Sequence, residues 1–526
     1  LFVLPVMKNL VSHQTAMKGI MRLQLLLFFV IPCLLPKLLI EGLSSPISGK
    51  KSIKKVAIVG SGIAGLSLAH ALVNSPDLQK DKASIDVSIY DSRSSMDYEA
   101  GAGVQLNGGM SVLRMINPKV QRAVADAALP LEKIQSRTKP WFGENAFDTL
   151  LEIPMEESIR EQGGNVEDTL IIENEVMVYA IMRGALQEVL MNTLPTETAE
   201  KIKFGKCLVE IKGNSDGAHV CFQDGSTEGP FDLVVGCDGV NSAVKEYIST
   251  GSIPKFGTRG QQALYSGIRI KYAIQDENVS HDKGEGAILR QYFGNSAYSL
   301  AGVYGNGSGK SPTKCAFLIY ADKNYLGPFK RKSISNGNSR SQDDENTDWS
   351  QDNRISTGET MLKQIKEFEV PNIDVNPIIE NSNRFFELGV YFHNPLNKWT
   401  KEIPNSGGTF CTLSGDAAHA MPPFLGQGSN QAIQDGYCLA AKIYEYNENL
   451  QSATDTADMA NVLKSYEKVR WKPTASISSK SFLLGYLESG GGPIGKFRDT
   501  FFKTCGVLGI AKKIYFGAAV PEITEK

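Results

Sequence analysis

The chain has 526 residues, with 55 basic and 57 acidic side chains and a formal net charge of -2. This length suggests two or three domains and is sufficient to bury a large cofactor. The balanced charge argues against a nucleic acid as partner and favours a small-molecule ligand. The 8 cysteines and 6 histidines are scattered and form neither a disulfide framework nor a metal-ligand pattern, so we expect no metal site.

Residues 1–50 differ in composition from the rest of the chain. Lys18 and Arg22 precede an uncharged apolar run from Leu25 to Leu35, and small residues follow from Gly42 to Ser45. This order is typical of a secretory signal peptide, and the run is shorter than the ~20 residues that span a bilayer. We therefore expect a signal for the secretory pathway or the first part of a plastid address. An uncleaved anchor, which would attach the protein to a membrane, is the alternative.

A buried strand followed directly by a glycine-rich turn is expected after this segment. Val56 to Val59 are all apolar, as in buried parallel strands, and GSGIAG follows them. In this pattern Gly60 permits a tight turn and Gly62 lets a pyrophosphate approach the backbone. Gly65 lets the following helix pack closely on the strand. The sequence therefore predicts a dinucleotide-binding turn.

The helix after this turn and the next strand provide further candidate contacts. The helix begins at Ile63 and Ala64, whose N–H groups would face the phosphates. The second strand is expected from Ile85 to Tyr90, and Asp91 follows it. An acidic side chain at this strand end binds a ribose 2′-hydroxyl and repels a 2′-phosphate, which favours FAD or NAD as the tightly held nucleotide. Arg93 is a neighbouring candidate contact, and a solvated strand end at Asp91 is the alternative.

The segment from Leu413 to Gly436, LSGDAAHAMPPFLGQGSNQAIQDG, combines a short strand, a loop rich in glycine and proline, and the start of a helix. It resembles the GD motif of the aromatic-hydroxylase (group A) family of FAD-dependent monooxygenases. That family includes para-hydroxybenzoate hydroxylase, salicylate hydroxylase and zeaxanthin epoxidase. The resemblance implies that Asp416 binds the ribityl chain of FAD. It also implies that the backbone at Gly426, Gly428 and Asn430 lies against the flavin ring.

The segment LVVGCDGVNSAVK, which ends at Lys245, resembles the DG motif of the same family. The resemblance implies that Asp238 and Gly239 help to bind the FAD pyrophosphate and take part in NAD(P)H binding. The family usually has arginine where this chain has Lys245, which keeps the charge but lacks the bidentate fork.

Two shorter matches occur between these motifs. GAGVQLNGG (101–109) corresponds to the family segment that reaches the flavin, and Gln105 is its candidate contact. Arg183 corresponds to an arginine that begins a helix and touches the cofactor. The alternative for Arg183 is an ordinary surface arginine.

The resemblance spans about residues 52–487 and implies an α/β (α+β overall) fold. We expect a Rossmann-like FAD-binding domain, an inserted antiparallel-sheet substrate domain and C-terminal helices. Strand-like runs at 263–270, 287–293, 299–304 and 315–320 support the inserted sheet. The expected organisation is a targeting segment at 1–50, the FAD-binding domain at 51–250 and 405–450, the substrate domain at 251–404 with a disordered insertion at 330–354, and a helical region at 451–526.

The family resemblance also implies the reaction. Such an enzyme uses NADPH or NADH and O₂ to insert one oxygen atom into a small aromatic or isoprenoid substrate, by hydroxylation or epoxidation. The reaction takes place at the flavin C4a position, so we assign no catalytic side chain and interpret His419 as structural. We expect a substrate pocket between the inserted sheet and the flavin, lined partly by Tyr265, Arg269 and Tyr292 or their neighbours.

Two alternatives remain open at this point. One is an FAD-dependent reductase or oxidase that inserts no oxygen, and the other is a non-catalytic flavin-binding redox sensor. The sequence leaves the choice between NADH and NADPH and the oligomeric state undetermined.

Overall fold

The structure is a computed structural model, and it describes most of the chain from residue 51 to residue 524. The described residues are 51–99, 101–140, 146–254, 263–277, 279, 281, 284–323, 325, 351–396, 398–451 and 458–524. The targeting segment expected at 1–50 lies outside them and stays a prediction. The insertion expected at 330–354 lies mostly outside them as well. Its last residues, 351–354, belong to helix α12 (Gln351–Glu367), so the expected boundary is a few residues too late.

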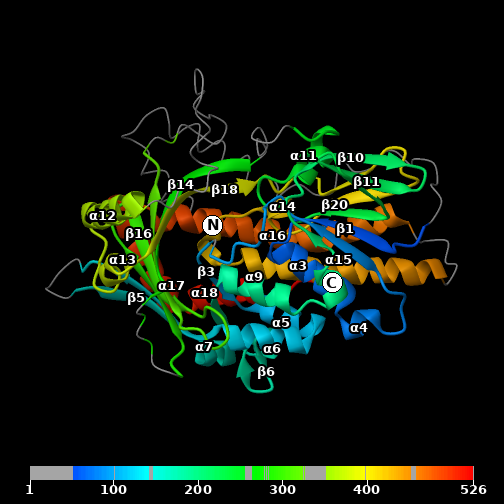
Figure 1. The fold of residues 1–526 in the computed structure, drawn as a ribbon. Helices are drawn as coiled ribbons and strands as arrows, with labels where there is room; N and C mark the ends of the chain where they lie inside the picture. The colour runs from blue at the N-terminus through cyan, green and yellow to red at the C-terminus, as the bar shows by residue number, and fades with distance from the viewer. Residues whose placement is uncertain are drawn as a thin grey trace, which may run out of the picture. The chain divides into compact units, whose positions relative to one another are not determined.

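A six-stranded sheet carries the glycine-rich turn (Figure 1). All neighbouring strands in it are parallel except the edge pair β19 and β20. The strands in spatial order are β19 (Thr400–Glu402), β20 (Phe410–Leu413), β13 (Leu233–Gly236), β1 (Lys55–Val59), β2 (Asp86–Tyr90) and β9 (Ile202–Lys203). The carboxyl ends of parallel strands meet at one edge of a sheet. The chain therefore brings Gly60, Asp238 and Asp416, which follow β1, β13 and β20, to the same edge.

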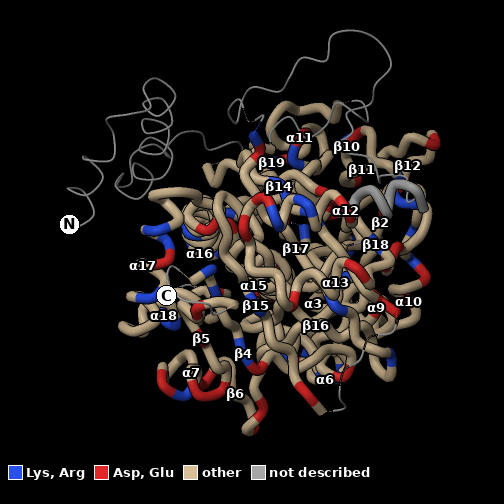
Figure 2. Tube along the Cα trace, turned by 90° about the vertical axis from the view of Figure 1, so that its left-hand side faces the viewer, with Lys and Arg blue, Asp and Glu red and all other residues tan. Residues whose placement is uncertain are grey.

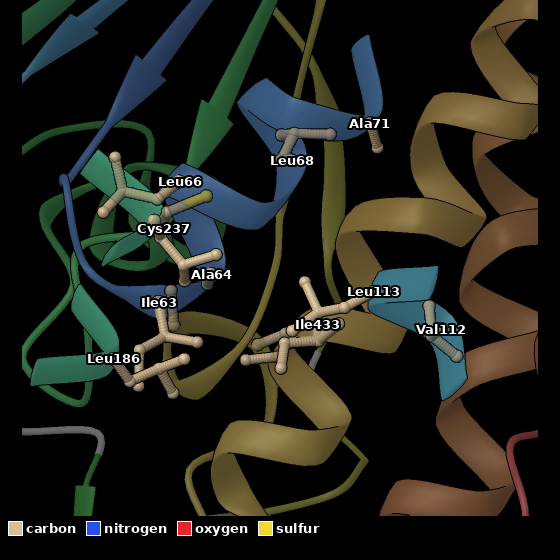
Figure 3. Packing of buried hydrophobic residues seen from close by; sticks show 14 of the residues in the cluster. Ile63, Ala64, Leu66, Leu68, Ala71, Val112, Leu113, Leu186, Cys237 and Ile433 are labelled. Carbon is tan, nitrogen blue, oxygen red and sulfur yellow. The ribbon is translucent and has the colours of Figure 1, made fainter. Parts of the chain in front are cut away.

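Helix α3 (Ile63–Val73) is buried along nearly its whole length between this sheet and three other helices. Those helices are α5 (Gly108–Ile116), α9 (Arg183–Asn192) and α15 (Gly428–Gln451). Figure 3 shows Leu186 of α9 beside Ile63, and Ile433 of α15 beside Leu113 of α5. A Cβ at Gly436 would lie only 2.7 Å from the backbone nitrogen of Leu68, so glycine lets α15 approach α3 closely.

A second, nine-stranded sheet contains the strands that the sequence predicts for the inserted domain. Its strands are β18 (Arg384–His393), β14 (Ala263–Gln275), β17 (Thr313–Ala321), β16 (Ala297–Tyr304), β15 (Ala287–Phe293), β4 (Leu129–Thr138), β8 (Tyr179–Met182), β3 (Gly103–Leu106) and β5 (Asp148–Pro154), the last paired with β4. The four predicted runs are confirmed as β14 to β17. The expectation that residues 251–404 alone supply the sheet is wrong at both ends. Strands before residue 251 extend it, β4 pairs with β15 in parallel, and β19 belongs to the first sheet.

One face of the second sheet packs against α12 and α13 (Asn376–Glu380), as Figure 1 shows. Tyr292 belongs to this cluster, together with Met361 of α12 and Ile378 of α13. Leu289 and Phe293, on the opposite face of the same strand, belong to the core shared with the first sheet. The expectation that Tyr292 lines the substrate pocket is therefore wrong, because strand alternation directs it to the other face.

The remaining elements connect and cover the two sheets. They are α4 (Pro76–Gln79), α6 (Pro118–Ala127), α7 (Met155–Gln162), α8 (Gly164–Leu170), β6 (Ile171–Ile172), β7 (Glu175–Val176), α10 (Thr196–Ala199), β10 (Leu208–Asn214), β11 (Gly217–Phe222), β12 (Thr227–Phe231), α11 (Ala243–Thr250), α14 (Asp416–His419), η2 (Pro423–Leu425), α16 (Met459–Glu488), α17 (Pro493–Val507) and α18 (Ile510–Ala519). Helices α16, α17 and α18 confirm the helical C-terminal region.

Surface charge and helix hydropathy agree with the composition of the chain. Basic and acidic residues are interspersed in the view of Figure 2. Among the helices that the structure describes, none combines the length and the apolar character needed to cross a bilayer.

Candidate cofactor and active site

The glycine-rich turn has the tight packing that its sequence predicts. Gly60 has φ +107°, and a Cβ there would lie 2.4 Å from the carbonyl oxygen of Cys237. A Cβ at Gly65 would lie 2.0 Å from the carbonyl oxygen of Gly60. Only glycine fits at either position, because both contacts are with backbone that cannot turn away. These two glycines bring β1, α3 and the loop after β13 into direct contact.

Three other predicted glycines face open space at the same edge of the sheet. A Cβ at Gly62, Gly239 or Gly428 would meet no atom within 4 Å. Helix α3 begins after Gly62 without a side-chain cap, so its first turn presents backbone N–H groups to this space. An uncapped helix N-terminus beside an open glycine suits a pyrophosphate. The residues present therefore fit the dinucleotide that the sequence predicts.

Asp91 is buried, and protein groups already occupy its carboxylate. Oδ2 accepts hydrogen bonds from the backbone N–H and the hydroxyl of Ser61, at 2.9 and 2.6 Å. Oδ1 accepts from the backbone N–H and Nε of Arg93, both at 2.9 Å. Burial alone would raise the pKa of Asp91, but the hydrogen bonds from Arg93 and Ser61 outweigh it and lower this pKa to about 2. A ribose hydroxyl would reach Asp91 only if the half-exposed Arg93 guanidinium turned aside.

Asp238 of the predicted DG motif caps helix α11. Its carboxylate accepts hydrogen bonds from the Ser242 hydroxyl at 2.5 Å and from the Ala243 N–H at 2.6 Å. The backbone around Asp238 lies against Gly60, whereas its side chain points to α11. Lys245 is buried and donates to the carbonyl oxygens of Ala417 and Ala418, at 3.3 and 3.1 Å. It therefore joins the DG segment to α14 of the GD segment.

Arg183 and Asp416 come from distant parts of the chain and face the same region. Asp416 is exposed, yet desolvation by the surrounding protein raises the pKa of its carboxyl, an effect that the charge of Arg183 partly opposes. Desolvation likewise lowers the pKa of Arg183, and Asp416 partly opposes this. The two side chains are therefore close enough to interact while Asp416 stays accessible to solvent. Gly101, with φ +93°, leaves room for Arg183, because a Cβ there would lie 3.0 Å from the arginine Cδ.

Asn430 joins the GD loop to the segment at 105–109. Its Oδ1 accepts from the backbone N–H groups of Asn107 and Gly109, at 2.8 and 3.0 Å. Its Nδ2 donates to the carbonyl oxygens of Gln105 and Gly426, at 3.0 and 3.2 Å. All four hydrogen-bonding positions of the fully buried amide are used, so the side chain holds the segment 105–109 against the loop at Gly426. The sequence places Asn430 at the site but does not reveal this role.

The C-terminal helix α18 also reaches the site, which the sequence does not predict. Tyr515 donates its hydroxyl hydrogen to the side-chain oxygen of Gln105 at 2.8 Å. A Cβ at Gly108 would lie 1.9 Å from the carbonyl oxygen of Ala519 at the end of α18. Nothing in the local pattern of 510–519 indicates this contact, because its partners are about 400 residues away in the chain.

A buried network of charged side chains stabilises the GD segment. Asp435 accepts from His419 Nε2 at 2.6 Å, from Arg470 Nε at 2.7 Å and from the N–H of Gly415 at 2.8 Å. Burial alone would raise the pKa of Asp435, but His419 and Arg470 outweigh it and hold this pKa below its usual value. His419 thus has the structural role that the sequence predicts, with Asp435 and Arg470 as partners that the sequence does not identify.

The face of the second sheet opposite α12 and α13 is aromatic. Tyr272 stacks on Phe386 with ring centroids 4.2 Å apart and contacts Phe317 edge-on at 5.3 Å. Tyr304 continues this row and lies against β3, since a Cβ at Gly103 would lie 2.3 Å from its ring. The row ends beside the segment that holds Gln105.

The other two expected pocket residues pair within the sheet. Arg269 forms an ion pair with Glu387 at 2.5 Å, and Glu387 also accepts from Tyr320, which packs against α12 and α13. Tyr265 donates to Asp322 at 2.8 Å. Arg269 therefore lies on the face of the sheet that packs against α12 and α13, so it cannot line a pocket beside the flavin.

An open hollow of about 800 Å³ lies away from these motifs. Its lining comes from residues 130–132, 154–157, 160, 161, 176 and 178, and none of the predicted cofactor contacts is among them. We do not assign it to the active site.

Comparisons with known proteins agree with the motifs. Residues 58–127 match the family described as NAD(P)-binding Rossmann-like domain, and residues 400–471 match the FAD binding domain family. The chain is 26% identical over 445 residues to 6-methylsalicylate 1-monooxygenase of Aspergillus terreus, covering 81% of each chain. It is 22% identical to salicylate hydroxylase of Pseudomonas putida, covering 82% of this chain and 86% of that enzyme. The chain is similar in sequence to FAD-dependent monooxygenases of the aromatic-hydroxylase type.

Solved structures show that the chain shares the fold of FAD-dependent hydroxylases. HpxO of Klebsiella pneumoniae, complexed with FAD and uric acid, has a TM-score of 0.62 at 15% identity, covering 89% of this chain and 97% of that chain. A salicylate hydroxylase substrate complex has a TM-score of 0.57 at 16% identity, covering 91% and 99%. The two family matches support FAD and NADPH or NADH as the cofactors of this protein.

Proposed function

We propose that this protein is an FAD-dependent monooxygenase that hydroxylates a small aromatic substrate. The substrate would bind between the aromatic face of the second sheet and an FAD held at the edge of the first sheet. The observation that carries the proposal is the convergence of Gly62, Arg183 and Asp416 on one open region, although they lie far apart in the sequence. When bound, FAD supplies the redox chemistry, taking a hydride from NADPH or NADH and passing one oxygen atom of O₂ to the substrate while the other leaves as water.

The described residues divide the binding of FAD among them. The first turn of α3 and the open space at Gly62 receive the pyrophosphate, and Asp91 lies where a ribose would be bound. Asp416 accepts hydrogen bonds from the ribityl hydroxyls, and Arg183 balances its charge. The N-terminus of α15, which begins at Gly428, points its partial positive charge towards the flavin ring.

The aromatic row supports an aromatic substrate over an isoprenoid one. Tyr272, Phe317 and Phe386 offer ring faces and edges at the spacing that favours stacking on another ring. Similar proteins include monooxygenases named for 6-methylsalicylate, 3-amino-4-hydroxybenzoate and salicylate, all of them substituted aromatic acids. We therefore choose aromatic acids as the first substrates to test, and hydroxylation over epoxidation as the reaction.

The test is a substrate screen on the purified full chain. Oxidation of NADPH or NADH is followed together with O₂ consumption, first without and then with each aromatic acid. A true substrate is expected to accelerate both rates and to yield a product heavier by one oxygen atom. Acceleration of both rates with hydrogen peroxide as the sole product would support the alternative oxidase. Failure of NADPH and NADH to reduce bound FAD with any ligand would support the redox sensor.

We further propose that residues 1–50 direct the protein to the secretory pathway or a plastid, on the composition of that segment alone. Fusing residues 1–50 to a fluorescent protein tests this. Diffuse cytosolic fluorescence would contradict it, and a fusion that keeps its full length at a membrane would support the uncleaved anchor.

A further inference from the structure

A small hollow beneath the GD motif contains three polar atoms that have no hydrogen-bond partner within the described part of the chain. They are Nδ1 of His393, Nδ1 of His419 and Nε1 of Trp399. The three side chains are only 2%, 6% and 1% exposed, and all three line the same hollow. The hollow leaves about 10 Å³ in which the centre of a water-sized sphere can lie. Buried polar atoms are normally paired, so three unpaired atoms around one hollow indicate a ligand.

The other nitrogen of each histidine determines what Nδ1 can do. Nε2 of His393 lies 2.9 Å from the carbonyl oxygen of Val240, which can only accept, so Nε2 carries the proton and Nδ1 presents a lone pair. Burial, reinforced by the charge of Lys245, lowers the pKa of His393 to about 3, so its ring is neutral. Nε2 of His419 donates to the Asp435 carboxylate, so Nδ1 is the His419 nitrogen that has no partner. Trp399 Nε1 is a donor only.

We propose that one buried water molecule occupies this hollow, accepts a hydrogen bond from Trp399, donates one to His393 and forms a third with Nδ1 of His419. Water can both accept and donate hydrogen bonds, and the hollow has room for a single water. An anion would meet the lone pair of His393, and a cation would meet the N–H of Trp399, so neither matches the three atoms.

The water completes a hydrogen-bonded connection between the two cofactor segments. The connection runs through Val240, His393, the water, His419, Asp435 and Gly415. Val240 follows the DG pair, and Gly415 precedes Asp416. The backbone N–H of His393 also donates to the carbonyl oxygen of Ala420 at 2.9 Å, which fixes His393 to the end of α14. His393 and Trp399 are therefore positioning residues for the two segments, a role that rests on the proposed binding of FAD between them.

A crystal structure of the full chain at a resolution that shows ordered water tests the site directly. We expect one density peak within hydrogen-bonding distance of all three nitrogen atoms. An empty hollow, or a hollow closed by direct contact of the side chains, would overturn the proposal. This result does not depend on FAD, so it separates the water site from the proposed function.

Paired substitutions test the connection in solution. Trp399→Phe and His393→Phe each remove one partner of the same water, and each is expected to raise the FAD dissociation constant about three- to tenfold. The double variant should bind no more weakly than the weaker single variant, because both lose the same water. Thermal unfolding midpoints of the FAD-free proteins should show the same lack of additivity.

Trp471→Phe is the matched control. Trp471 lines the same hollow, but its Nε1 donates to the carbonyl oxygen of Pro395 and is therefore not a partner of the proposed water. Its effect should add to that of His393→Phe. Additive effects of Trp399→Phe and His393→Phe on both the dissociation constant and the unfolding midpoint would overturn the shared water.

Discussion

Gly60 and Gly62 lie two residues apart in one turn, but their substitution by alanine should have different consequences. Gly60→Ala places a Cβ against the backbone of Cys237 at a positive φ, so it should destabilise the protein by about 1–3 kcal/mol. Gly62→Ala meets no atom, so the FAD-free protein should keep its stability while FAD binds more weakly. Urea unfolding and FAD titration of both variants measure the difference. Equal FAD affinity of Gly62→Ala and the unsubstituted protein would mean that the pyrophosphate does not lie at this turn.

Asp416 provides the most specific cofactor contact that we propose. Asp416→Asn removes the charge that accepts the ribityl hydrogen bonds and should raise the FAD dissociation constant about 10- to 100-fold without unfolding the chain. Asp126→Asn, on the exposed surface of α6, is the control and should bind FAD normally. The role assigned to Asp416 fails if both variants retain FAD equally well.

Asp91 should make the FAD-free protein sensitive to acid. Its pKa is lowered in the folded state from 3.8 to about 2. A depressed carboxyl pKa adds stability at pH values above 3.8, here about 2 kcal/mol, and this contribution is lost as the pH falls towards 2. The free energy of unfolding should therefore fall more steeply from pH 5 to pH 2 in the unsubstituted protein than in Asp91→Asn. The difference should develop between the two pKa values of Asp91, 3.8 in the unfolded chain and about 2 in the folded protein. Parallel pH profiles would contradict the hydrogen bonding described for Asp91.

At the scale of elements, Arg470 and Asp435 join α16 to α15 beneath the GD loop. Both side chains are completely buried, so Arg470→Met removes the arginine charge from a buried carboxylate that keeps only His419 and the Gly415 N–H as partners, and should cost about 3–5 kcal/mol. Arg122→Met breaks the exposed pair with Glu175 and should cost less than about 1 kcal/mol. Urea unfolding compares the two variants. A similar small loss in both would show that the buried network does not hold these helices.

Single elements could be predicted from the sequence where the local pattern determines them. The apolar run before Gly60 is strand β1, the runs from 263 to 320 are strands β14 to β17, and the helical region expected at 451–526 contains α16, α17 and α18. Local pattern did not determine which face of β15 meets the cofactor side. Alternation tells only that Tyr292 and Phe293 point in opposite directions, and the position of α12 decides which of them faces outward.

At the scale of the whole molecule, the edge of the first sheet could be predicted because three motifs each follow a strand. The contacts that complete the site could not be predicted, since they join distant segments. Asn430 bonds to residues 105–109, and Tyr515 bonds to Gln105. The extension of the second sheet by β3, β4 and β8 is of the same kind, because strand pairing over long separations leaves little trace in local sequence.

The convergence of those motifs on one dinucleotide is the central claim, and the visible spectrum of the purified full chain after incubation with FAD and removal of free cofactor tests it most directly. We expect the absorption bands of oxidised flavin at one equivalent of FAD per chain, bleached when NADPH or NADH and a substrate are added without O₂. A folded but colourless protein that retains no FAD under these conditions would contradict the account.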